Sequence, residues 1–134
     1  MTEKSPLSKL LTKKEEVDEY LLYELLKDFI RIEEDSGELI FTKEYGKLSE
    51  KGKVLVVLLA QKARVRLRKA PKRFPKEELR PKEIEVLSGV KSSTVRVSLM
   101  KLKGEGFIKP TEDGYFVPNY ALPKIKTFLD SMKK

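Results

Sequence analysis

Residues 80–108 carry the sequence RPKEIEVLSGVKSSTVRVSLMKLKGEGFI, which predicts two short helices joined by a tight turn. Pro81 suits the first turn of a helix, where its missing N–H is not needed. Gly89 suits the left-handed residue that ends such a helix. The Ser92 hydroxyl can accept a hydrogen bond from the free N–H groups at the start of the next helix. We therefore expect one helix on each side of the glycine.

Both expected helices have an apolar side at helical spacing. Ile84 and Leu87 predict the inner face of the first helix. Val95, Leu99 and Leu102, at positions i, i+4 and i+7, predict the inner face of the second. Two short helices joined by a glycine turn form a helix-turn-helix. The polar side of the second helix is then left to face solvent or a partner.

Two short apolar runs follow the second helix. Gly106 suits the end of that helix, residues 107–109 and 115–117 predict two strands, and residues 112–114 supply the turn between them. Leu79 predicts a further short strand that pairs beside this hairpin. The sequence thus predicts a small β-hairpin next to the helix pair.

With these elements in place, the stretch that contains SSTVRVSLMKLKGEGFI resembles the winged helix-turn-helix superfamily, specifically its small archaeal and bacterial transcription-regulator-like domains. The resemblance covers roughly residues 48–117 and does not extend to the first 47. It implies a mainly α fold with a small β wing (α+β). We expect residues 48–134 to form the winged helix-turn-helix domain with a C-terminal helix, and residues 1–47 to form an extension of a helix and a short hairpin.

The usual activity of this superfamily is sequence-specific binding of double-stranded DNA, with the second helix (92–103) in the major groove and the wing (107–117) on the backbone. By position, the resemblance implies that the base-reading candidates are Ser92, Ser93, Thr94, Arg96, Val97 and Lys101. Arg96 suits a bidentate contact with guanine, and the methyl groups of Thr94 or Val97 suit a thymine methyl. The alternatives are that Arg96 is an ordinary surface charge and that Val97 and Met100 pack on a neighbouring segment.

Other basic residues are candidates for phosphate contacts, which position a protein on DNA without specifying sequence. They are Lys69, Lys72, Arg73, Lys76, Arg80, Lys82, Lys91, Lys103 and Lys109. Compared with the superfamily, residues 64–76 form an inserted basic segment. One interpretation is an arm that follows the phosphate backbone or enters a minor groove. The other is a solvated loop with Phe74 packed on the core.

The basic residues are concentrated in the C-terminal part of the chain. The 29 Lys and Arg against 21 Asp and Glu give a net charge of +8. Residues 1–47 hold 8 basic and 12 acidic residues, and residues 48–134 hold 21 and 9, so the two parts carry −4 and +12. This asymmetry predicts a polyanionic partner for the C-terminal part.

Cysteine and histidine are both absent. Their absence removes thiolate and imidazole metal ligands, cysteine nucleophiles and the commonest general base. The acidic run 33–35 lacks the ligand spacing of a calcium loop. Glu77, Glu78 and Glu83 lie in basic surroundings without a phosphate-binding glycine loop. We therefore expect no enzyme, no catalytic or metal-binding residues, no cofactor and no small-molecule ligand.

Amphipathic helices are predicted on both sides of the central region. The first runs from Thr12, a plausible N-cap with Glu15 three residues later, to Ile30. Strands on either side of residues 35–37 follow it as a hairpin with a three-residue loop, for which Gly37 can supply a positive φ. The last helix covers residues 120–132. Both helices have surplus apolar surface, which either closes the chain's own core or forms a homodimer.

A buried central helix is expected after Ser49, through VLVVLLAQKARVRL. Its end is ambiguous, because residues 64–68 alternate as a strand would and also continue the helix in phase. The longest apolar run, Val54–Ala60, is far shorter than the about 20 residues that cross a bilayer, and the N-terminus lacks a signal-peptide core. We expect a cytoplasmic protein without a membrane partner. The Lys/Glu-rich composition, with one asparagine and one glutamine, is typical of heat-adapted proteins.

These observations favour a homodimeric transcriptional regulator that binds a short inverted repeat in double-stranded DNA through two copies of the 92–103 helix. The N- and C-terminal helices would form the dimer. The alternative is a non-specific nucleic-acid binder, or a protein-interaction winged-helix module, in a replication, repair or RNA-processing assembly.

Overall fold

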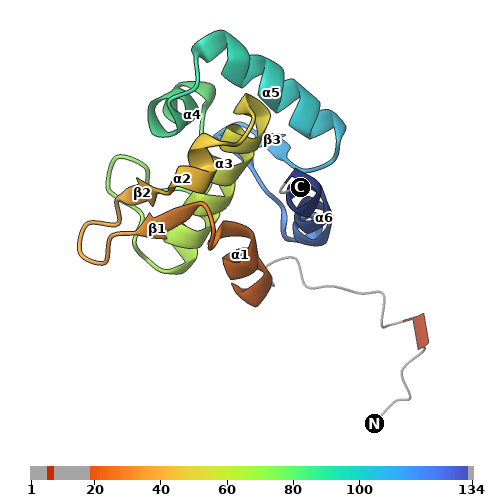
Figure 1. Ribbon diagram of the computed structural model, residues 1–134, viewed down its shortest axis with the longest axis horizontal. Helices are drawn as coiled ribbons and strands as arrows, with labels where there is room; N and C mark the ends of the chain where they lie inside the picture. The colour runs from red at the N-terminus through yellow and green to blue at the C-terminus, as the bar shows by residue number, and fades with distance from the viewer. Residues whose placement is uncertain (1–5, 8–18, 133–134) are drawn as a thin grey trace.

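The computed structural model describes residues 6–7 and 19–132, and within these ranges the chain forms six α-helices and two antiparallel β-hairpins (Figure 1). The earlier elements are α1 (Glu19–Leu26), β1 (Ile30–Ile32), β2 (Leu39–Phe41), α2 (Lys43–Gly46) and α3 (Glu50–Arg66). The later elements are α4 (Pro81–Ser88), α5 (Ser92–Gly104), β3 (Lys109–Thr111), β4 (Gly114–Phe116), the 3-10 turn η2 (Asn119–Ala121) and α6 (Leu122–Met132). This is an α+β fold, as the sequence predicts.

The helix α3 lies at the centre of the fold, and most of its surface is covered. The Ser49 hydroxyl accepts a hydrogen bond from the Gly52 N–H (3.1 Å), which caps the start of the helix. Every residue from Val54 to Ala60 is fully buried, because α1, α4 and α5 all pack on this helix. The helix continues through Arg66 and Leu67 is its C-cap, so the first three of the alternating residues 64–68 extend it in phase and none of the five forms a strand.

The helices α1 and α6 pack against each other, and α1 also contacts α3. Their apolar side chains belong to one core cluster with α3, and the buried members are Leu22, Leu25, Leu26, Leu122, Ile125 and Leu129. Packing within the chain therefore accounts for much of the apolar surface that the sequence shows in these two helices. The N-cap predicted at Thr12 and its partner Glu15 lie outside the described residues.

The first amphipathic helix ends at Leu26, so the prediction that it continues to Ile30 is wrong. The Phe29 N–H donates to the Leu26 carbonyl (2.9 Å), and the Phe29 carbonyl accepts from the Thr42 N–H (3.0 Å). These bonds turn the chain out of the helix and into β1. The apolar pattern could not reveal this turn, because Phe29 and Ile30 are buried in either conformation.

The first hairpin pairs β1 with β2, with Arg31 opposite Ile40. The Glu33 N–H donates to the Glu38 carbonyl (2.8 Å), so the loop has four residues inside this bond and not the three expected. Gly37 has φ +76°, and a Cβ at this position would lie 1.9 Å from the Lys69 carbonyl oxygen. Glycine is thus required both by the backbone conformation and by the close approach of the segment that follows α3.

The second hairpin pairs β3 with β4, with Lys109 opposite Phe116. Its strands have the predicted length but are displaced: β3 begins two residues later than predicted, because Phe107 and Ile108 are buried in the core before it, and β4 begins one residue earlier. Leu79 forms the predicted bridge to Tyr115. The C-terminal helix α6 begins after η2, two residues later than predicted from position 120.

Candidate nucleic-acid interface

The turn between α4 and α5 is fixed by backbone geometry and by two side chains. Gly89 has φ +77° and its N–H donates to the Glu85 carbonyl (3.0 Å), which is the left-handed helix end that the sequence predicts. The Ser88 hydroxyl accepts from the Val90 N–H (3.1 Å), and Val90 is buried. The Tyr45 hydroxyl of α2 donates to the Ser88 carbonyl (2.8 Å). The start of α5 is therefore held in a fixed direction relative to the core.

The N-cap of α5 is Lys91, and the prediction of Ser92 as the cap is wrong. Lys91 has the extended backbone of a cap residue (φ −59°, ψ 149°), whereas Ser92 is already helical. Because Val90 must reach the core directly after the glycine, the helix begins one residue earlier than the serine pattern suggests. No side chain forms a cap hydrogen bond at this end. The N–H groups of the first turn thus have no side-chain acceptor.

One side of α5 is buried and the opposite side is open. Val95, Leu99 and Leu102 point into the core, as predicted, and Ser98 is buried with them. Five of the base-reading candidates are exposed, and Thr94 is half-buried. The exposed five are Ser92, Ser93, Arg96, Val97 and Lys101.

Apolar side chains lie in the middle of this open side. Val97 is 50% exposed and Met100 is 72% exposed. The alternative that these two residues pack on a neighbouring segment is therefore wrong. Because they are three residues apart, they share one helix face. That face is apolar at its centre and basic at its edges, where Arg96 and Lys101 lie.

The cations on the outer side of α5 have no carboxylate partner within the described part of the chain. Arg96, Lys101 and Lys103 form no ion pair there, and neither do the phosphate-contact candidates Lys82 and Lys91. The sequence of α5 contains no acidic residue. The carboxylate that follows it, Glu105, is paired with Lys51 of α3 at 3.0 Å. The outer side of α5 is consequently an exposed surface of uncompensated positive charge.

The basic segment 64–76 is built differently, because several of its polar groups bond within the molecule. Arg64 is only 2% exposed and donates to the Gly37 carbonyl (3.0 Å) and to Gln61 Oε1 (2.6 Å). Burial, and the nearby charge of Arg73, lower the pKa of Arg64. Lys69 Nζ donates to the Glu34 carbonyl in the first hairpin (2.6 Å). These contacts hold the segment against β1 and β2.

The other end of the segment is also anchored. Gln61 Nε2 donates to the carbonyls of Phe74 (2.8 Å) and Lys76 (2.7 Å), and the Phe74 ring is buried. Lys76 pairs with Asp113 at the tip of the second hairpin (3.2 Å). The geometry therefore favours a loop packed on the core over an extended arm. In the segment, Arg68, Lys72 and Arg73 are exposed and form no ion pair among the residues that the structure describes.

The hairpin β3–β4 offers little positive charge at its tip. Glu112 and Asp113 occupy its turn, and Asp113 is the partner of Lys76. Lys109, at the base of the hairpin, is exposed and lies 6.0 Å from the centre of the Tyr120 ring. Arg80 is also exposed, and its backbone N–H donates to Glu83 Oε1 (2.8 Å). Phosphate contact from the hairpin would thus fall to Lys109 and not to the turn.

Sequence reasoning missed the residues that hold these parts together. Gln61, Arg64 and Lys62 are polar yet buried on α3. Lys62 Nζ contacts Glu77 Oε2 and the Val117 carbonyl, both at 2.9 Å. One signal was present, because the single glutamine of the chain lies at the end of its longest apolar run, where a buried polar group must be hydrogen-bonded.

In comparisons with known proteins, no protein-family model, curated protein or solved structure matches the chain. Within the described ranges, no group of three or more acidic side chains is placed to hold a metal ion. No helix there is long and apolar enough to span a membrane.

Proposed function

We propose that this chain is a DNA-binding transcriptional regulator whose α5 enters the major groove of double-stranded DNA. The observation that carries the proposal is the outer side of α5, where exposed cations have no ion-pair partner and the helix has no acidic residue. DNA attracts such a surface through its phosphates, and a helix fits the width of the major groove. Arg96 and Lys101 flank the centre line of this side and would reach base edges.

The proposal includes a finer reading of the fold as a winged helix-turn-helix. The α4–turn–α5 unit supplies the helix pair, and α3 is the helix on which both pack. The hairpin β3–β4 follows α5 directly and pairs with Leu79, which is the arrangement expected of a wing with a short third strand. In this reading, Lys109 is the wing's contact with the backbone.

The beginning of α5 is suited to a phosphate group. Its first-turn N–H groups have no side-chain cap, and Lys91, Ser92 and Ser93 are all exposed there. Free N–H groups and the positive end of the helix dipole favour an anion. A phosphate at this end would fix the position of α5 on the duplex, so that Arg96, one turn further along, would meet a base.

A homodimer on an inverted repeat remains part of the proposal. The buried sides of α1 and α6 are used within the chain, so a dimer contact would have to use the surface that is left. Tyr20 and Tyr23 of α1 are exposed, and their ring centres lie 6.3 Å apart. They are the aromatic surface that a second copy would cover.

Selection of binding sites from random duplexes tests the proposal. We expect an enriched motif, with two copies in inverted orientation if the chain binds as a dimer. Recovery of no motif, with equal affinity for all duplexes, would remove the sequence-specific function and leave only electrostatic binding. Sedimentation of the protein with the selected duplex gives the number of chains bound.

A protein-interaction module is the second candidate, and the apolar centre of the α5 face favours it. Val97 and Met100 together expose apolar surface of the kind found at protein contacts, and the tip of the second hairpin is acidic. A pull-down followed by nuclease treatment separates the two candidates, because a protein partner held by this face survives the nuclease and a partner bridged by DNA does not.

A further inference from the structure

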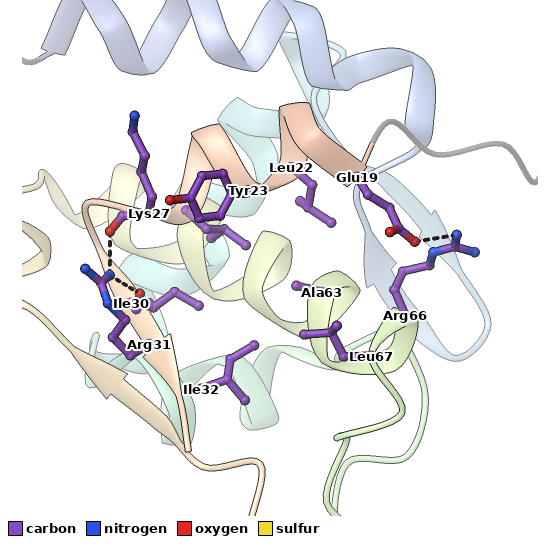
Figure 2. A pocket seen from close by; sticks show the side chains of 11 residues that line it. Glu19, Leu22, Tyr23, Lys27, Ile30, Arg31, Ile32, Ala63, Arg66 and Leu67 are labelled. Carbon is purple, nitrogen blue, oxygen red and sulfur yellow. Dashed lines mark hydrogen bonds and ion pairs between the residues drawn. The ribbon is translucent and has the colours of Figure 1, made fainter. Parts of the chain in front are cut away.

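A groove of about 430 Å³ lies between α1, β1 and the C-terminal end of α3. Figure 2 shows that its walls are largely aliphatic, with side chains from all three elements directed toward one space. The aliphatic lining residues are Leu22, Leu26, Ile30, Ile32, Ala63 and Leu67. Its volume falls within the range of about 300–1,000 Å³ that is usual for small-molecule sites.

The two ends of the groove differ in charge (Figure 2). At one end, Arg66 pairs with Glu19 at 2.8 Å, so this cation is neutralised. At the other end, Arg31 donates from one guanidinium nitrogen to the Ile30 carbonyl (2.7 Å) and to the Lys27 carbonyl. Arg31 forms no ion pair with any residue that the structure describes. The groove therefore has an apolar floor and a cation without a carboxylate at one end only.

We propose that this groove binds a medium-chain monocarboxylic acid, with its hydrocarbon chain along the aliphatic walls and its carboxylate at Arg31. Burial of the chain removes apolar surface from water, and a guanidinium bonds a carboxylate with a charge-assisted hydrogen bond. The site is separate from the DNA-binding surface, since α1 and α5 lie on opposite sides of α3 (Figure 1). The proposal goes beyond the regulatory function and does not depend on it.

Titration with decanoate and with decanol tests the proposal, followed by amide chemical shifts in two-dimensional NMR. We expect decanoate to shift amides of α1, β1 and the end of α3, and to bind more tightly than decanol. Equal affinity for the acid and the alcohol would overturn the assignment of a carboxylate ligand. Absence of shifts at these elements with either compound would overturn the site.

Two arginine variants then test whether the charge of Arg31 contributes to binding of the acid. Arg31→Gln should weaken decanoate binding by about fivefold to tenfold and leave decanol binding unchanged. Arg96→Gln removes an exposed arginine on the opposite side of α3 and should leave both affinities unchanged. Equal loss of decanoate and decanol in Arg31→Gln would mean that the variant damages the groove, and would contradict a role for this charge in binding the acid.

A variant that fills the groove tests the rival occupant, a second copy of this chain. Ala63→Phe places a ring among the aliphatic walls and should abolish binding of both compounds while the amide spectrum keeps its native dispersion, which reports that the protein is folded. If Ala63→Phe instead converts a dimer into a monomer, and the wild-type protein binds neither compound, the groove is an interface between protomers and the proposal is wrong.

Discussion

The outer side of α5 and the segment 64–76 are both rich in Lys and Arg, but the structure uses these cations differently. On α5, Arg96 and Lys101 are exposed and form no ion pair in the described part of the chain. In the segment, Arg64 is buried, Lys69 bonds to the first hairpin and Lys76 pairs with Asp113. One region presents positive charge to the surroundings, and the other uses much of it to hold the fold together.

The density of basic residues therefore does not by itself locate an anion site. An ammonium group that already donates to a carbonyl or a carboxylate, such as that of Lys69 or Lys76, gives up a formed bond when it binds a phosphate. A guanidinium bonded through one nitrogen, as in Arg31, keeps its other nitrogens for an anion. A cation without a partner gives up only its hydration. Arg68, Lys72 and Arg73 are the exceptions within the segment, since all three are exposed and form no ion pair among the described residues. They are the residues of the segment whose charge is available to a nucleic acid.

The largest effect is expected from Arg64→Ala. It leaves the Gly37 carbonyl and Gln61 Oε1 without their donor and opens a cavity on α3. We expect a loss of about 3 kcal/mol in the free energy of unfolding, measured by chemical denaturation. Arg73→Ala, which removes an exposed arginine from the same segment, should change this quantity by less than about 0.5 kcal/mol. A similar loss of unfolding free energy in the two variants would contradict the claim that Arg64 stabilises the fold and Arg73 does not.

The next effect concerns binding, not stability. Arg96→Gln should reduce affinity for the selected duplex by about 1–3 kcal/mol and relax base preference at one position, because a bidentate guanine contact is lost. Fluorescence anisotropy on the selected duplex and on a scrambled one measures both. Thermal unfolding should be unchanged, since Arg96 is exposed. An unchanged preference would show that Arg96 is an ordinary surface charge.

A smaller change in stability is expected from Tyr45→Phe. This variant removes a hydrogen bond at the turn before α5 and leaves the charges of α5 in place. The variant leaves the Ser88 carbonyl without its donor and should lower the free energy of unfolding by about 1 kcal/mol near neutral pH. Burial raises the pKa of Tyr45 well above its ordinary value, so the neutral hydroxyl stabilises the fold.

The pH dependence of this variant follows from the raised pKa. The stabilisation is complete below the ordinary pKa of tyrosine, about 10, and is lost as the pH rises above it. The gap in stability between the wild-type protein and Tyr45→Phe should therefore narrow in alkaline solution. Denaturation series at neutral and alkaline pH measure the gap, and a gap that widens instead would contradict a buried, neutral Tyr45.

Much of the fold could be predicted from local patterns. Short-range spacing and backbone preference predict the turn at Gly89, the inner face of α5, the start of α3 after Ser49 and the bridge at Leu79. The early end of α1 could not be predicted, because it depends on hydrogen bonds from Thr42, which lies beyond the first hairpin loop.

The exposure of the candidate residues on α5 could also be predicted, because it follows from the helical repeat. Residues that lie off the Val95 and Leu99 face must point outward on a regular helix, so their exposure follows from periodicity. The fate of Arg64 and Lys69 depends on carbonyls of the first hairpin, which are distant in sequence. Periodicity carries no information on such bonds, so the sequence left open whether the basic segment is a phosphate-binding arm or a loop with Phe74 on the core.

The most direct test of the central claim compares two double variants that remove the same amount of charge. Lys101→Gln with Lys103→Gln removes free cations of α5, and Lys69→Gln with Lys76→Gln removes bonded cations of the segment. The quantity measured is the slope of log affinity against log salt concentration on the selected duplex. We predict that the first variant reduces the slope by about 2 and that the second leaves it unchanged. Equal reductions in the two variants would contradict the claim that α5 is the DNA-binding surface.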